Sequence, residues 1–116
     1  GPRQGRPMAR VVERVALFRM RPSVPEPRAQ ELLDSLWSLQ YRVPGVMCAT
    51  AGQALQEGDG RFTHAVHMRF PSPRELERFE ASPLLGELRA GMVDALCEDS
   101  LAVTFSGDVE DDILPL

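Results

Sequence analysis

One segment, residues 60–85, constrains the fold more than any other, because a strand pattern becomes a helix pattern within it. Side chains alternate from residue 62 to residue 70, and one set is apolar apart from a histidine: Phe62, His64, Val66, Met68 and Phe70. Pro71 cannot donate to a sheet and predicts the end of the strand. Ser-Pro pairs at 72–73 and 82–83 then predict the starts of two successive helical segments. His64 therefore lies on a core-facing strand that leads into a broken helix.

The remaining elements follow from the same spacing rules. Apolar alternation predicts strands, apolar residues three and four apart predict helices, and proline and glycine separate them. Together with the strand at 62–70, the pattern gives strands at 11–20, 46–53 and 101–105 and helices at 27–41, 73–81 and 83–97. The resulting order, β-α-β-β-α-α-β, predicts an α+β ferredoxin-like fold, in which one antiparallel sheet carries its helices on one face.

Length and charge limit the classes of function. The 116 residues form one domain, and a net charge of −4 argues against a nucleic-acid partner. No apolar run approaches the roughly 18 residues of a membrane helix, so we expect no membrane association. Cys48 and Cys97 lie in apolar segments without the spacing of metal ligands, which predicts free thiols and no metal site. Nothing in the sequence indicates a cofactor.

The two ends differ in composition from the rest. Residues 1–10 begin with a basic stretch that lacks acidic side chains, and we interpret them as a disordered leader or a tag remnant. The domain then covers residues 11–107, and residues 108–116 form an acidic tail or linker. We expect a cytoplasmic protein, and the basic start leaves a plastid as the alternative.

The first strand carries apolar side chains on both faces. Val11, Val15 and Leu17 share the face that a single helical layer leaves uncovered. These three residues therefore predict the interface of a homodimer.

Several segments together resemble a known family. Val-Glu-Arg-Val-Ala-Leu-Phe-Arg-Met at 12–20, Pro-Gly-Val at 44–46 and Phe-Thr-His-Ala-Val-His-Met-Arg-Phe at 62–70 are similar to the stress-responsive dimeric A/B barrel domain, notably its plant members. Leu76, Phe79 and the Ser-Pro pair at 82–83 extend the resemblance. The resemblance implies a dimeric α/β barrel, in which two sheets pair face to face, and a role in stress response.

The family includes a polyketide cyclase, and its pocket positions can be compared with this chain. The resemblance places the catalytic tyrosine at Phe79 and the general-base histidine at Leu85. A pocket histidine of the first strand falls on Arg14, and the strand histidine is retained as His64. Arg14, His64, Phe79 and Leu85 are therefore the expected ligand pocket. Because neither Phe79 nor Leu85 can transfer a proton, we expect no efficient catalysis, with His64 as the remaining candidate base.

Each polar residue has a structural and a functional interpretation. His64 is either a hydrogen-bonded core histidine or a catalytic base, and its neighbour His67 lies on the opposite strand face, so the two cannot share a metal ion. Arg14 either pairs with a helix carboxylate or binds an acidic ligand.

Three hypotheses on function remain open. The first is a non-catalytic homodimeric stress-response domain that binds a small hydrophobic or aromatic acid between sheet and helices. The second is a small polyketide-cyclase-like enzyme that uses His64 as its base. The third is a structural assembly domain of a tandem-domain protein.

Overall fold

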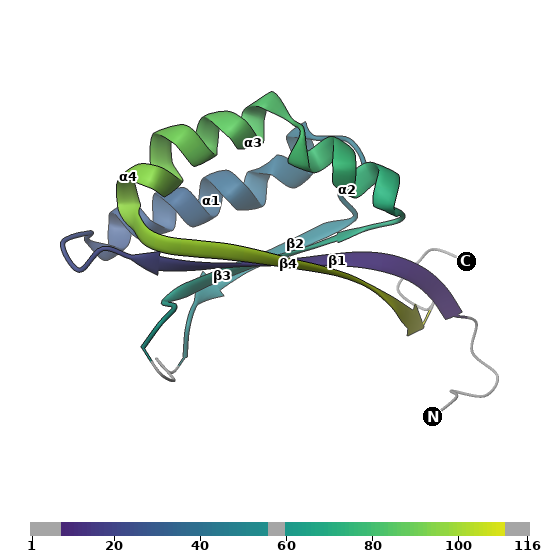
Figure 1. The fold of residues 1–116 in the computed structure, drawn as a ribbon, viewed down its shortest axis with the longest axis horizontal. Coiled ribbons are helices and arrows are strands. Elements are labelled where there is room, and N and C mark those ends of the chain that lie inside the picture. The colour runs from purple at the N-terminus through teal and green to yellow at the C-terminus, as the bar shows by residue number, and fades with distance from the viewer. Residues whose placement is uncertain (1–7, 56–59, 111–116) are drawn as a thin grey trace.

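The computed structural model describes residues 8–55 and 60–110. The elements in chain order are β1 (Met8–Met20), α1 (Glu26–Arg42), β2 (Cys48–Gln53), β3 (His64–Phe70), α2 (Pro73–Glu80), α3 (Pro83–Leu88), the π-helix η1 (Arg89–Val93), α4 (Asp94–Leu96) and β4 (Cys97–Glu110). The four strands form one sheet in the order β2-β3-β1-β4, and every pairing is antiparallel. The helices of the described residues all cover the same face of this sheet (Figure 1). The predicted ferredoxin-like α+β fold is confirmed.

The first and last strands of the chain are longer than the side-chain pattern predicts. Met8 pairs with Glu110, so β1 starts at Met8 and β4 extends to Glu110. Residues 8–10 therefore lie in β1, and residues 108–110 lie in β4. Backbone groups make these pairings, which leave little trace in side-chain alternation. The other residues of the predicted leader and tail, 1–7 and 111–116, lie outside the described part of the chain.

A single apolar layer between the sheet and the helices forms the core. The helix-facing side of β1 and β3 contributes Val12, Ala16, Phe18, Met20, Val66, Met68 and Phe70, and α1 contributes Ala29, Leu32, Leu33, Leu36 and Leu39. These helix residues recur at three- and four-residue spacing, as an amphipathic helix requires. The predicted core stripe of the first helix is confirmed.

The break between α2 and α3 has a local cause. Ser82 caps α3 by accepting a hydrogen bond of 3.2 Å from the backbone N–H of Leu84, and Pro83 occupies the first turn. The chain then continues through α3, η1 and α4 to Leu96. Within these helices Leu85 and Val93 turn inward onto the sheet.

The second face of the sheet carries no helix in the described ranges (Figure 1). Val103 and Phe105 on β4 are 53% and 50% exposed there. Val11, on the same face of β1, is only 2% exposed within the protomer. No helix among the described residues is long and apolar enough to cross a membrane.

Candidate ligand-binding site

A cavity of about 160 Å³ lies between the sheet and the helices, close to β4. Apolar side chains from β1, α1, α3 and β4 form most of its wall, including Ala16, Leu36, Leu85 and Ala102. Two arginines, Arg14 from β1 and Arg89 from η1, also line it. The cavity therefore combines an apolar interior with two positive charges.

Arg14 is the most unusual residue of this wall, because its side chain is only 8% exposed. Its guanidinium lies over the ring of Phe79, 5.4 Å from the centroid, and its Nε lies 3.7 Å from Glu80 Oε2. That distance is too long for a hydrogen bond, and Arg14 Nε has no hydrogen-bond partner among the described residues. A buried donor without a partner costs free energy, so the Arg14 guanidinium favours an acceptor close to Nε.

Electrostatics at Arg14 also favour an anion. Burial lowers the pKa of the Arg14 guanidinium, the Glu80 carboxylate opposes this shift, and the positive charge of Arg89 adds to it. Arginine remains protonated in proteins even when its pKa falls. A carboxylate in the cavity would relieve both the desolvation of Arg14 and its repulsion by Arg89.

The four predicted pocket residues do not share one cavity. Arg14 and Leu85 line the cavity described above. Phe79 is 0% exposed and supports the Arg14 guanidinium with its ring. His64 lies instead at a second cavity, of about 420 Å³, at the end of β3. The structure places His64 at a different cavity from Arg14 and Leu85, because alternation along a strand gives the face of a residue but not its position relative to the helices.

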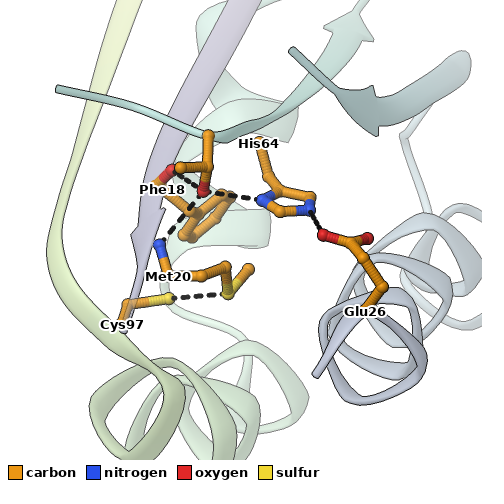
Figure 2. Close-up of polar contacts among 6 residues, drawn as sticks. Phe18, Met20, Glu26, His64 and Cys97 are labelled. Carbon is orange, nitrogen blue, oxygen red and sulfur yellow. Dashed lines mark hydrogen bonds and ion pairs between the residues drawn. The ribbon is translucent and has the colours of Figure 1, made fainter. Parts of the chain in front are cut away.

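His64 is held by polar groups on both sides of its ring (Figure 2). Its Nδ1 lies 2.7 Å from Thr63 Oγ1, which also accepts the backbone N–H of Met20 at 3.1 Å. Its Nε2 points to the Glu26 carboxylate at the start of α1, 3.5 Å from Oε1. The Thr63 hydroxyl also lies 3.3 Å from the Phe18 carbonyl oxygen, and its single proton goes either there or to His64 Nδ1. This network joins β1 to the start of β3, whereas His64 Nε2 has no hydrogen-bond partner among the described residues and its contact with Glu26 is not a hydrogen bond.

The opposite face of the sheet carries a charged cluster that the sequence did not reveal. Glu13 is 8% exposed and accepts two hydrogen bonds of 2.9 Å from Arg69, and His67 Nε2 lies 3.2 Å from Glu13 Oε1. The hydrogen bonds from Arg69 lower the pKa of Glu13. His67 and His64 lie on opposite faces, as the strand period predicts.

Sequence reasoning also missed Arg89 and Glu26. Arg89 follows Leu85 by four residues, so a helical reading of 83–97 places both on one face. The four-residue spacing of Leu85 and Arg89 could therefore have predicted a basic residue at the cavity. Glu26 had no comparable signal, since its contact with His64 depends on how α1 packs on the sheet.

The described residues contain no group of three or more histidine, cysteine, aspartate and glutamate side chains able to hold a metal ion. Cys48 is on β2 and Cys97 is on β4, which are the two edges of the sheet. This separation prevents a disulfide between them within one protomer.

Comparison with solved structures shows the same fold in several proteins. The hydroxynitrile lyase of Passiflora edulis is 20% identical, with a TM-score of 0.73 over 84% of this chain and 93% of that chain. A dimeric ferredoxin-like protein of Thermobifida fusca is 19% identical, with a TM-score of 0.72 over 85% and 92% of the two chains. A Dabb family protein of Mesorhizobium loti with a ferredoxin-like fold is 10% identical, with a TM-score of 0.71 over 83% and 95%.

Comparison at the level of sequence gives a family. No curated protein matches this chain. The family model described as "Stress responsive A/B Barrel Domain" matches residues 12–106, which include every strand and helix of the cavity wall. The chain therefore belongs to the stress-responsive A/B barrel domain family.

Proposed function

We propose that this chain is a homodimeric stress-response domain that binds a small hydrophobic or aromatic acid and does not itself catalyse a reaction. The observation that carries the proposal is the Arg14 Nε–H, buried at the wall of an apolar cavity and without a hydrogen-bond partner in the described ranges. A carboxylate supplies the acceptor and the negative charge that this position lacks. The apolar wall accommodates the rest of the ligand.

The cavity volume limits the size of the ligand. An engineered protein cavity of about 150 Å³ binds benzene, and the cavity at Arg14 measures about 160 Å³. One aromatic ring with a carboxylate therefore fits. Benzoate is the natural probe.

The first experiment is a calorimetric titration with benzoate, with benzyl alcohol as the uncharged comparison. For a ligand of this size we expect a Kd on the order of 0.1–1 mM. Arg14→Met should weaken benzoate binding at least about 10-fold, because it removes a charge-assisted hydrogen bond. Arg28→Met is the matched control, since Arg28 is half exposed and pairs with Glu31 on the surface of α1. Equal binding of benzoate to wild type and Arg14→Met would contradict the proposal.

The open sheet face supports the homodimer. Val15 and Leu17 lie on this face and are partly exposed, whereas Val11 is already buried within the protomer and contributes little new contact. Structural neighbours such as the Thermobifida fusca protein are described as dimeric. Light scattering at micromolar concentration should give twice the protomer mass, and Val15→Asp should give a monomer or an unfolded chain. A monomeric wild type would contradict the dimer.

A second candidate function is a small enzyme that uses His64 as its base. The observation in its favour is the Glu26 carboxylate beside His64 Nε2, at the edge of a separate cavity. One fold neighbour, the Passiflora edulis protein, is a hydroxynitrile lyase and therefore an enzyme. His64 is 3% exposed, and its Nε2, like Arg14 Nε, has no hydrogen-bond partner among the described residues. A comparison of wild type with His64→Ala, described in the Discussion, decides between the two candidates.

A further inference from the structure

The free nitrogen of His64 faces a carboxylate. The His64 side chain is only 2% exposed, and its Nε2 is a buried atom without a hydrogen-bond partner in the part of the chain that the structure describes. The nearest charged group given for it is the Glu26 carboxylate at the start of α1, with Oε1 at 3.5 Å (Figure 2). A buried polar atom without a partner costs free energy. The position therefore favours an occupant that the nitrogen and the carboxylate can bind together.

The contacts of Nδ1 determine what Nε2 can bind. Thr63 Oγ1 lies 2.7 Å from Nδ1, 3.1 Å from the backbone nitrogen of Met20 and 3.3 Å from the carbonyl oxygen of Phe18. When the Thr63 hydroxyl donates to the Phe18 carbonyl, its oxygen accepts hydrogen bonds from the Met20 N–H and from the ring Nδ1–H. The lone pair of Nε2 then points to the Glu26 carboxylate. Two electron-pair donors face each other in this tautomer, and a cation between them makes the arrangement favourable.

The separation of the two groups matches the size of a metal ion. Zinc binds a histidine nitrogen at about 2.0–2.1 Å and a carboxylate oxygen at about 2.0–2.2 Å, so two such ligands on a tetrahedral ion lie about 3.4 Å apart. His64 Nε2 and Glu26 Oε1 are 3.5 Å apart. A water molecule with tetrahedral hydrogen bonds of about 2.8 Å to both atoms would hold them about 4.5 Å apart. The observed separation therefore fits an ion better than a bridging water.

Gln53 can supply a third ligand. It pairs with His64 across β2 and β3, so the two side chains lie on the same face of the sheet. Both residues line the cavity of about 420 Å³, together with Glu26, whose side chain is 58% exposed. Arg21 also lines this cavity, but its guanidinium donates to the backbone carbonyl groups of residues 94 and 95. The solvent-facing side of the cavity leaves room for water ligands.

We propose that His64 Nε2 and the Glu26 carboxylate bind a zinc ion, with the Gln53 amide oxygen and water completing its coordination. The nitrogen ligand favours zinc and related transition metals over magnesium and calcium, which prefer oxygen. Structural zinc sites use four protein ligands, so this site exchanges its ion with solution and is not required for folding. The inference goes beyond the proposed acid-binding function and uses none of the residues at Arg14.

Calorimetric titration with zinc chloride tests the site. We expect one ion per protomer, and His64→Asn should weaken zinc binding at least about 10-fold. His67→Asn is the matched control, because the chain has two histidines and His67 lies on the opposite sheet face, 3.2 Å from Glu13 Oε1. His67→Asn should bind zinc as the wild type does. Equal zinc affinity in wild type and His64→Asn, or loss of zinc binding in His67→Asn, would overturn the proposal.

A second variant keeps the test decisive if His64→Asn does not fold. Glu26→Ala removes an exposed carboxylate and should also weaken zinc binding at least about 10-fold. Glu31→Ala, at another exposed position of α1, should leave the zinc affinity unchanged. Equal affinity in wild type and Glu26→Ala would overturn the proposal.

The ring nitrogens of the two histidines report the location of the ion directly. In long-range ¹H–¹⁵N NMR spectra, zinc chloride should shift the His64 Nε2 resonance and leave a proton on Nδ1, as the contact with Thr63 requires. Magnesium chloride at the same concentration should leave the resonance in place. Because metal ions compete with protons for the ring nitrogen, the zinc affinity should fall as the pH is lowered from 7.5 to 5.5. Zinc that shifts the His67 ring alone would place the ion at Glu13 and overturn the proposal.

Discussion

The guanidinium of Arg14 lies over the ring of Phe79, 5.4 Å from its centroid. By family resemblance, Arg14 occupies the position of a pocket histidine of the cyclase, and Phe79 occupies the position of its catalytic tyrosine. The two replacements are therefore in contact, and the residue at the tyrosine position now supports a positive charge. A cation over an aromatic face is favourable when both are shielded from water. This contact holds Arg14 at the cavity wall, where the proposed function requires a positive charge.

The first prediction concerns the stability cost of Arg14. A buried charge with only a distant carboxylate is expensive, so Arg14→Met should leave the free energy of unfolding unchanged or raise it by about 1 kcal/mol or more. Urea denaturation of both proteins at one protomer concentration measures the difference. A loss of more than about 3 kcal/mol would mean that Arg14 is a structural partner of Glu80 and not a ligand group.

The second prediction concerns the His64 network. Thr63→Val keeps the shape of the side chain but leaves the Met20 N–H and His64 Nδ1 without their partner, and should cost about 1–3 kcal/mol of stability. Thr104→Val is the control, because Thr104 is an exposed residue of β4. Thermal or urea unfolding should show the loss for Thr63→Val alone. Equal effects of the two substitutions would argue against the network.

The third prediction concerns pH. The pKa of Glu13 is lower in the folded protein than its ordinary value of 4.5, chiefly because Arg69 donates hydrogen bonds to it. A carboxylate with a lowered folded-state pKa contributes stability above its unfolded pKa, and this contribution is lost as pH falls through the folded pKa. The stability difference between wild type and Glu13→Gln should therefore be largest near pH 7 and shrink below about pH 4.5.

Urea unfolding at several pH values, at one protomer concentration, measures this dependence. Glu31→Gln on the surface of α1 is the control, since Glu31 is exposed. A difference between wild type and Glu13→Gln that stays constant from pH 7 to below pH 4 would contradict the assigned role of Arg69.

The fourth prediction concerns catalysis. A linear polyketide acid should not be cyclised by the wild type, because Leu85 lines the cavity without a proton-transfer group and Phe79 is fully buried. Loss of a positioned general base typically costs about 10²–10⁴ in rate. Wild type and His64→Ala should therefore be equally inactive in a product assay. Robust turnover by wild type that disappears in His64→Ala would establish the enzyme hypothesis.

The sequence predicts the order of elements well because apolar side chains recur at the strand or helix period along the elements that form the core. The strand 62–70 carries its apolar side chains at period two, and the Ser-Pro pairs define the helix starts, so this segment could be assigned from local chemistry. The ends of β1 and β4 could not, because exposed strand positions such as Ser106 and Asp108 continue the backbone ladder without an apolar alternation that marks where it stops.

The positions of the site residues relative to one another were less predictable, because they depend on contacts between distant segments. The family resemblance indicated Arg14 and Leu85, but the sequence does not show how far apart residues on one sheet face lie. His64 and Arg14 share the helix-facing side and yet line different cavities. Contacts such as His64 with Glu26 and Glu13 with Arg69 join distant segments, and only the packed structure brings them together.

The most direct test of the central claim observes the Arg14 side chain during ligand binding. In a ¹H–¹⁵N NMR titration with benzoate, the Arg14 Nε–Hε resonance, identified by its absence in Arg14→Met, should move progressively downfield as the N–H gains an acceptor. Benzyl alcohol at the same concentration should leave it in place or shift it much less. An Arg14 Nε–Hε resonance that does not respond to benzoate, while benzoate perturbs other residues, would show that the acid binds elsewhere and would contradict the account.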